Sequence, residues 1–158
     1  CMASPLLHKT HNHKSAVVGS VICFKDTIIM NIKNFFFYLG FSFLCTHELD
    51  AVANNEWQVL PFINLLPIEY GQAVFILLHI PLFSFLVSMI ASTNQIIRNK
   101  TKFLLSAFLA VHGVLHIAFM NHSEYEFESI LSNTIIFGGA LSGIFYLVIN
   151  QLQNEKRT

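Results

Sequence analysis

The chain has 158 residues, of which 54% are hydrophobic and only 11% are charged, and its formal net charge is zero. Soluble globular domains carry about 25% charged residues, so this composition excludes an ordinary water-soluble domain. The balanced charge also excludes nucleic acid as a partner, because the chain has no basic surface that would neutralise phosphates.

Basic residues are confined to the two ends of the chain and to one short internal stretch. The segments 34–97 and 103–155 contain no Lys or Arg, whereas most of the acidic residues fall within them. The basic stretch RNKTK, residues 98–102, separates the two segments. Basic residues stay on the cytoplasmic side of a membrane protein. The pattern therefore predicts an even number of membrane crossings, with both termini and a loop at 98–102 in the cytoplasm.

Four apolar segments are long enough to cross a membrane, which takes about 20 mostly apolar helical residues. They span about residues 35–53, 70–93, 103–120 and 130–152. The short connections between them favour antiparallel neighbours. We therefore predict an all-α fold, a four-transmembrane-helix up-down bundle that crosses the inner (plasma) membrane with both termini inside.

Residues 1–29 do not fit this bundle. Their apolar run AVVGSVICF is only nine residues long, which is too short to span a membrane, and no small-residue cleavage site follows it. Met30 stands directly before NIKNFFFYLG and is a natural start for a membrane protein. We therefore predict a membrane domain at 30–158, preceded by a poorly ordered leader at 1–29 that lies upstream of the true start.

Titratable side chains inside three of the four segments are the candidate functional residues. They are His47, Glu48 and Asp50 in the first segment, His79 in the second, and His112 and His116 in the third. Ionisable residues in membrane helices are costly to insert and usually mark function. At about 1.5 Å of rise per residue, all four histidines lie in the outer half of the bilayer. Three helices thus bring imidazoles to similar heights.

These residues predict a shared metal site. His112 and His116 are four residues apart on one helix face, a spacing that helical zinc sites use. Asp50 follows His47 by three residues and shares its face, so it can bind the metal or orient the imidazole. The predicted metal ligands are His47, Asp50, His79, His112 and His116, with zinc or iron as the ion. Glu48 and Asp50 are the predicted catalytic residues of a hydrolase or oxygenase that acts on membrane lipid.

Two other functions remain open. Histidines of two helices, such as His79 and His112, can ligate a b-type haem inside the bundle. Alternatively, the protein is a non-enzymatic accessory or transport protein, in which the polar residues join helices by hydrogen bonds. Metal content and haem absorption distinguish these functions.

The fourth segment resembles a scaffold helix. It has no Asp, Glu, Lys, Arg or His between Glu128 and Glu155. Gly139 and Gly143 form a small-xxx-small pair, which allows close helix approach. This pair predicts packing within the chain or a homo-oligomer.

Several motifs carry a family resemblance. They are HELDAVANNEW at residues 47–57, followed by HIPLF, HGVLH and LSNTIIFGGALSG. Over about residues 30–152 the chain resembles a family of small bacterial four-helix integral membrane proteins of unknown function. The resemblance implies the four-helix topology and implies no activity.

Overall fold

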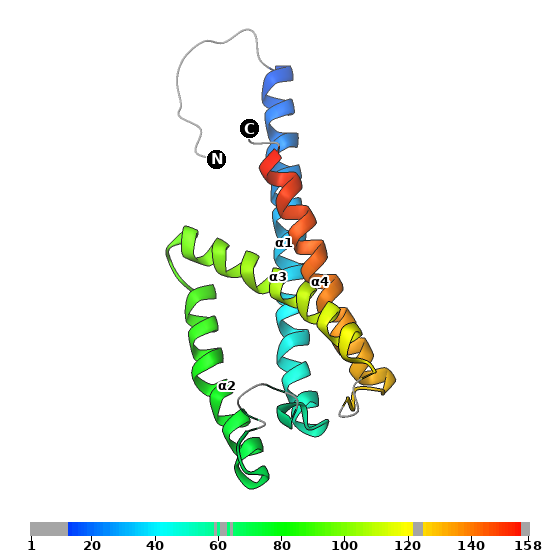
Figure 1. The fold of residues 1–158 in the computed structure, drawn as a ribbon. Coiled ribbons are helices and arrows are strands. Elements are labelled where there is room, and N and C mark those ends of the chain that lie inside the picture. Colours follow the sequence, from blue (N-terminus) through cyan, green and yellow to red (C-terminus); the bar gives the residue numbers. More distant parts are fainter. Residues whose placement is uncertain (1–12, 59, 61–62, 64, 122–124, 156–158) are drawn as a thin grey trace.

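The computed structural model describes residues 13–58, 60, 63, 65–121 and 125–155. Within them it has four α-helices and one short 3-10 helix (Figure 1), namely α1 (His13–Ala53), η1 (Glu56–Gln58), α2 (Ile68–Ile90), α3 (Gln95–Phe119) and α4 (Ile130–Glu155). The predicted all-α fold is confirmed. All four α-helices are long and apolar enough to cross a membrane. Their up-down order and their orientation in the membrane stay predictions.

Helix α1 starts earlier than predicted. It begins at His13 and passes through Met30 without a break, and its candidate membrane span is Thr27–Ala53. No proline interrupts this part of the sequence, so nothing ends the helix between its two ends. Part of the predicted leader is therefore helical, while residues 1–12 lie outside the described residues. A true start at Met30 stays a prediction.

The predicted loop at 98–102 between the second and third helices is wrong. That stretch lies within α3, which begins at Gln95. The side chain of Asn94 caps α3 by accepting hydrogen bonds from the backbone N–H groups of Ile96 and Ile97, at 2.9 and 3.4 Å. The side chain of Arg98 donates to the carbonyl of Ser92 at 2.8 Å. The turn is therefore shorter than predicted, and the basic residues stand on the first turns of a helix.

The helices do not contribute equally to the bundle. In Figure 1, α1 and α4 lie side by side and antiparallel, α3 crosses them, and α2 stands apart. Both α1 and α3 pack extensively on α4, whereas α2 contacts mainly α3. Helix α2 is also the most hydrophobic of the four and the least buried. Most of its apolar surface therefore contacts no other described helix of the chain.

Two apolar clusters form the core. One contains Phe37, Leu44, Leu105, Leu109 and Tyr146, and the other contains Ala51, Trp57, Phe75, Phe127 and Ile136. The second cluster fixes η1 against the start of α2, because the Trp57 ring lies on Gly71. A Cβ on Gly71 would come within 2.6 Å of that ring, so only glycine fits there.

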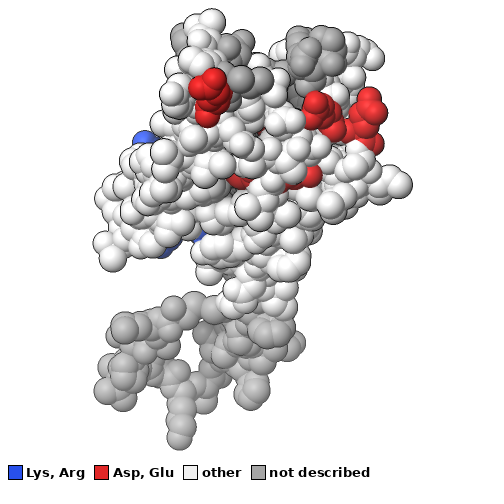
Figure 2. Space-filling view, turned by 90° about the horizontal axis from the view of Figure 1, so that it is seen from below, with Lys and Arg blue, Asp and Glu red and all other residues white. Residues whose placement is uncertain are grey.

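The two ends of the bundle differ in charge. Figure 2 looks at the end that carries η1: most of the surface is uncharged, and among the charged side chains Asp and Glu cover more of it than Lys and Arg. Basic residues mark the opposite end. There the buried Lys102 ammonium donates a hydrogen bond to Asn34 Oδ1 at 2.9 Å. It also lies 5.0 Å from the ring centroid of Phe37 and 4.9 Å from that of Tyr38. These contacts join α3 to α1.

Replacement of Asn34 by alanine is expected to lower the free energy of unfolding by about 1–3 kcal/mol, because the buried ammonium of Lys102 then loses its acceptor. Chemical unfolding in detergent measures the change. The matched control is Asn31→Ala, on an exposed position of the same helix. An equal effect of the two variants would contradict the prediction.

Gly139 and Gly143 are both buried inside the chain. A Cβ on Gly143 would lie 2.5 Å from the backbone oxygen of Ser106 in α3, and a Cβ on Gly139 would lie 3.3 Å from Phe43 Cβ in α1. The pair therefore serves packing within the bundle, which removes it as the surface for a homo-oligomer. Homo-oligomerisation itself stays a prediction.

Candidate metal centre

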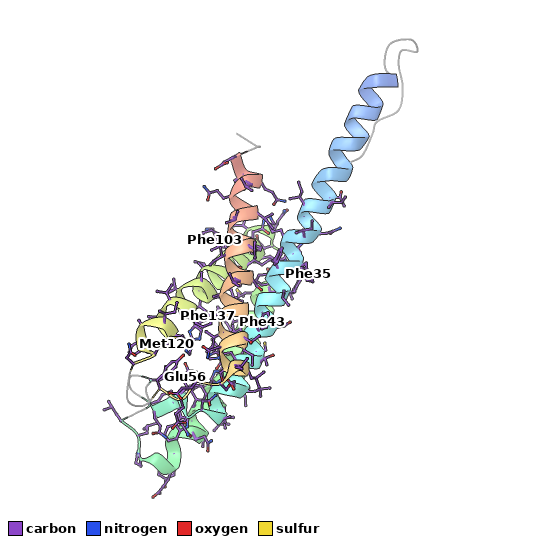
Figure 3. All side chains as sticks on the ribbon, turned by 90° about the vertical axis from the view of Figure 1, so that its right-hand side faces the viewer. Phe35, Phe43, Glu56, Phe103, Met120 and Phe137 are labelled. Atoms are coloured by element: carbon purple, nitrogen blue, oxygen red, sulfur yellow. The ribbon has the colours of Figure 1, made fainter. Side chains whose placement is uncertain are left out.

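Four donor side chains meet near the end of the bundle that carries η1. They come from α1, η1 and α3, and their ligand atoms lie within 4.8 Å of one another: His47, Glu56, His112 and His116, here called the four-donor cluster. Figure 3 shows Glu56 at the same end as Met120, far from Phe35 and Phe103. His47 and His116 are buried, and the other two members are half-buried.

The backbone explains how these donors converge. His112 and His116 share one face of α3 because they are one helical turn apart. After α1 ends at Ala53, Asn55 takes a left-handed conformation with φ of 52°, which asparagine tolerates better than most residues. This residue reverses the chain, and the side chain of Glu56 returns toward α1. Its Oε2 lies 3.3 Å from Nε2 of His47.

His112 stands at the centre of the histidines. Its Nε2 lies 3.0 Å from Nε2 of His47 and 3.1 Å from Nε2 of His116. An imidazole nitrogen carries either one proton or one lone pair, so it serves one good hydrogen bond at a time. The two contacts of His112 Nε2 therefore cannot both be good hydrogen bonds at the same time. Three nitrogens that turn toward one point are instead the arrangement in which lone pairs bind a cation.

The distances fit a tetrahedral ion. Zinc binds imidazole nitrogen at about 2.0–2.1 Å, which places tetrahedral ligand atoms about 3.3 Å apart. The contacts of 3.0, 3.1 and 3.3 Å within the four-donor cluster are close to that spacing. The ligand atoms of the whole cluster lie within 4.8 Å of one another, so the more distant pairs must close in for all four to bind one tetrahedral ion.

A second layer of groups surrounds the cluster. The Tyr125 hydroxyl lies 3.3 Å from Nδ1 of His116, and the Phe127 ring packs against His47 and His116. Metal-binding histidines commonly donate their other N–H to such a partner, which leaves Nε2 free for the ion. Asp50 Oδ2 is buried and has no hydrogen-bond partner among the described residues. This orphaned oxygen fits a cationic centre better than a neutral core.

The charge state of Glu56 suits a ligand. Burial raises the pKa of its carboxyl, but the hydrogen bond with His47 and the charges of the three histidines outweigh burial and lower the pKa below its usual value. Burial, together with the charge of Glu56, raises the pKa of the Tyr125 hydroxyl. At neutral pH the Glu56 carboxyl is therefore ionised, and the Tyr125 hydroxyl is neutral.

The predicted site residues are only partly brought together. His47, His112 and His116 meet, whereas Asp50 and His79 lie outside the four-donor cluster. Asp50 comes close enough for its charge to act on His116, without joining the ligands. Sequence reasoning missed Glu56, because no helix periodicity relates it to the histidines. The sequence signal was the pair of asparagines before it, which favours a chain reversal.

His79 of α2 forms a separate pair with Glu48 of α1. Its Nδ1 donates to the carbonyl of Phe75 at 2.7 Å, and its Nε2 lies 2.7 Å from Oε2 of Glu48. Glu48 thus contacts a neighbouring helix and takes no part in the four-donor cluster. A haem between His79 and His112 would require both imidazoles to leave their present partners.

Comparison with known proteins gives a family but no activity. No curated protein and no solved structure shows significant similarity to the chain. The sequence profile of one family matches residues 33–153, which is most of the chain. The chain therefore belongs to the family of unknown function DUF6713.

Proposed function

We propose that this protein is an integral membrane metalloprotein whose four-donor cluster holds one divalent transition-metal ion, zinc or iron. The meeting of three imidazole Nε2 atoms around His112, at 3.0 and 3.1 Å, carries the proposal. A cation replaces contacts that cannot all be hydrogen bonds with metal–nitrogen bonds, and the Glu56 carboxylate beside these nitrogens offsets the charge of the ion. Imidazole and carboxylate groups suit both metals.

The activity that we propose for this site is a metal-dependent reaction on membrane lipid. Catalytic zinc sites use three protein ligands and keep a position for water. The three histidines can supply those ligands, and Glu56 then stands where a carboxylate serves as general base toward the water. Bound zinc lowers the pKa of water to about 7, while iron supports oxygen chemistry. We therefore propose Glu56, rather than Glu48 or Asp50, as the acid–base residue.

We further propose that the protein lies in the plasma membrane with both termini in the cytoplasm. Basic side chains at one end of the bundle and acidic side chains at the η1 end match the preference of basic residues for the cytoplasmic side. In this orientation the four-donor cluster lies in the outer half of the membrane. Metal and water then reach it from outside.

Elemental analysis after gentle detergent extraction tests the proposal. We expect about one zinc or iron per chain, which a strong chelator removes and added zinc restores. A preparation from metal-replete cells that holds no stoichiometric metal, and that takes up none when zinc is added, would contradict it. The absence of a Soret band from the same preparation separates this function from a haem protein.

Replacement of Tyr125 by phenylalanine is expected to weaken zinc binding about 10–100-fold, because His116 Nδ1 loses the hydroxyl that orients its ring. Competition with a chromophoric chelator measures the affinity. Tyr70→Phe is the control, since Tyr70 is exposed at the start of α2. Equal affinities for the two variants would show that Tyr125 does not support the ligand.

A further inference from the structure

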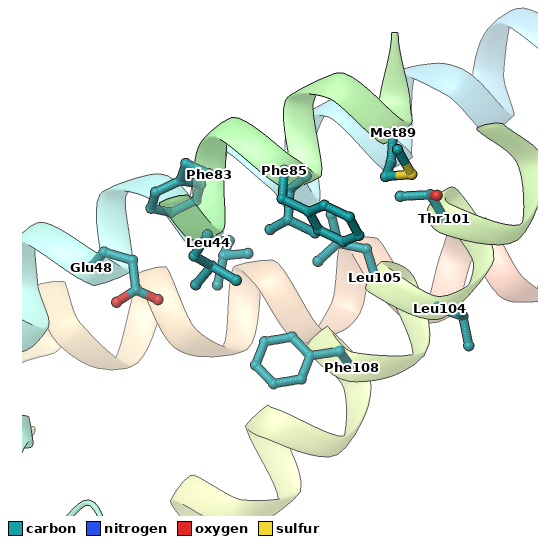
Figure 4. A pocket seen from close by; sticks show the side chains of 11 residues that line it. Leu44, Glu48, Phe83, Phe85, Met89, Thr101, Leu104, Leu105 and Phe108 are labelled. Carbon is teal, nitrogen blue, oxygen red and sulfur yellow. The ribbon is translucent and has the colours of Figure 1, made fainter. Parts of the chain in front are cut away.

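An apolar cavity of about 490 Å³ lies between α1, α2 and α3. Small-molecule sites typically have about 300–1,000 Å³ and are mostly apolar with a few polar groups. Figure 4 shows Glu48 at one end of the lining and Met89 and Thr101 at the other. Phe85 and Leu104, which also line it, are largely exposed on the lipid-facing surface. A hydrocarbon chain can therefore enter from the membrane.

The end of the cavity at Glu48 accepts hydrogen bonds. Glu48 and Thr101 are the polar side chains of the described lining, and the Thr101 hydroxyl already donates to the carbonyl of Ile97 at 2.9 Å. Glu48 uses Oε2 toward His79, and its Oε1 has no hydrogen-bond partner among the described residues. Whichever of Glu48 and His79 holds their shared proton, Oε1 only accepts. This oxygen favours a ligand that donates a hydrogen bond and repels a carboxylate.

The cavity adjoins the four-donor cluster. Phe108 lines the cavity, and its ring stacks on that of His112 at a centroid distance of 5.3 Å. Glu48 also interacts electrostatically with His47 and Glu56. A ligand whose polar end lies at Glu48 therefore holds that end beside the metal ligands.

We propose that this cavity binds a single-chain lipid whose polar end is a hydrogen-bond donor, an alcohol or an amide, rather than a fatty acid. The chain lies between α2 and α3 toward Met89 and Thr101, and the polar end donates to Glu48 Oε1. Glu48 lies toward the η1 end of the bundle. In the proposed orientation this is the side on which the polar group of an outer-leaflet lipid lies. That this lipid is the substrate of the metal site rests on the proposed function.

Photocrosslinking tests the site. The probes are a diazirine-bearing hexadecanol and the matching hexadecanoic acid, added to the full chain in lipid nanodiscs at about pH 9, where the acid is ionised. We expect saturable labelling of residues 82–89 and 101–108 by the alcohol, and at least about tenfold weaker labelling by the acid. Glu48→Gln, which places at the polar end an amide that donates as well as accepts, is expected to abolish most of this preference.

Variants that fill the cavity complete the test. Met89→Trp and Leu82→Trp each place a larger ring in the lining and are expected to reduce labelling about tenfold. Two are used so that a failure of one to fold leaves the other. The control is Leu77→Trp, at an exposed position of α2 outside the lining. Labelling that both filling variants leave unchanged, or equal labelling by alcohol and acid in the unmodified protein, would overturn the inference.

Metal content, measured on the same preparations, separates the two proposals. Stoichiometric metal without saturable labelling overturns the lipid site and leaves the metal centre standing. Saturable, alcohol-selective labelling of a preparation that holds no metal and takes up no added zinc supports the lipid site and overturns the metal centre.

Discussion

Replacement of His112 by alanine is expected to abolish stoichiometric metal binding and to weaken zinc affinity by at least about 100-fold. Its Nε2 lies 3.0 Å from Nε2 of His47 and 3.1 Å from Nε2 of His116, so the variant loses the donor that links the other two. Loss of a group that merely supports a ligand weakens metal sites about 10–100-fold, and loss of the ligand itself is expected to exceed this.

Thermal unfolding with and without zinc provides a second measurement. Zinc that binds only the folded protein stabilises it by about 2.7 kcal/mol at a free concentration one hundred times the Kd. The unmodified protein is expected to gain this stability and His112→Ala to gain almost none. A variant that keeps both its metal and its zinc-dependent stability would contradict the assignment of His112.

His79→Ala is the informative control for this experiment. His79 is a predicted ligand from sequence, yet its nitrogens contact Phe75 and Glu48 rather than the four-donor cluster. We expect the variant to keep its metal. If His79→Ala lost its metal while His112→Ala kept it, the ligand set predicted from the sequence would be favoured over the four-donor cluster.

The fold was predictable from sequence because a membrane imposes length and polarity on each helix. Four apolar segments must become four helices when lipid offers no partner to the backbone. The ends of the helices were less predictable, as the error at 98–102 shows. Lys and Arg mark the side of the membrane but do not end a helix, whereas the capping residue Asn94 does.

The candidate site was half predictable, for a related reason. Periodicity placed His112 and His116 on one face, and depth placed His47 at a similar height. Depth does not give distance across the bundle: α2 packs mainly on α3, and His79 pairs with Glu48 instead of joining the four-donor cluster. Glu56 joins the cluster because Asn55 before it adopts a left-handed backbone conformation, which the pattern of apolar residues does not predict.

Replacement of Gly143 by alanine is expected to destabilise the bundle by about 1–3 kcal/mol. A Cβ at this position would lie 2.5 Å from the backbone oxygen of Ser106 and 3.1 Å from Leu109 Cβ. A backbone atom cannot move aside as a flexible side chain can, so α3 must shift away from α4. This shift loosens the helix pairing that fixes α3, and with it two members of the four-donor cluster.

Gly139→Ala is the matched control, one helical turn earlier on α4. There a Cβ would meet Phe43 Cβ at 3.3 Å and Leu109 Cδ2 at 3.6 Å, so a shift of α1 by a few tenths of an ångström accommodates it. Alanine also favours a helix over glycine by about 1 kcal/mol, so this variant is expected to be neutral or slightly more stable. Unfolding in detergent compares both variants with the unmodified protein. If Gly143→Ala were as stable as Gly139→Ala, the close contact between α3 and α4 at Ser106 would not be a determinant of the fold, and a looser crossing would have to position His112 and His116.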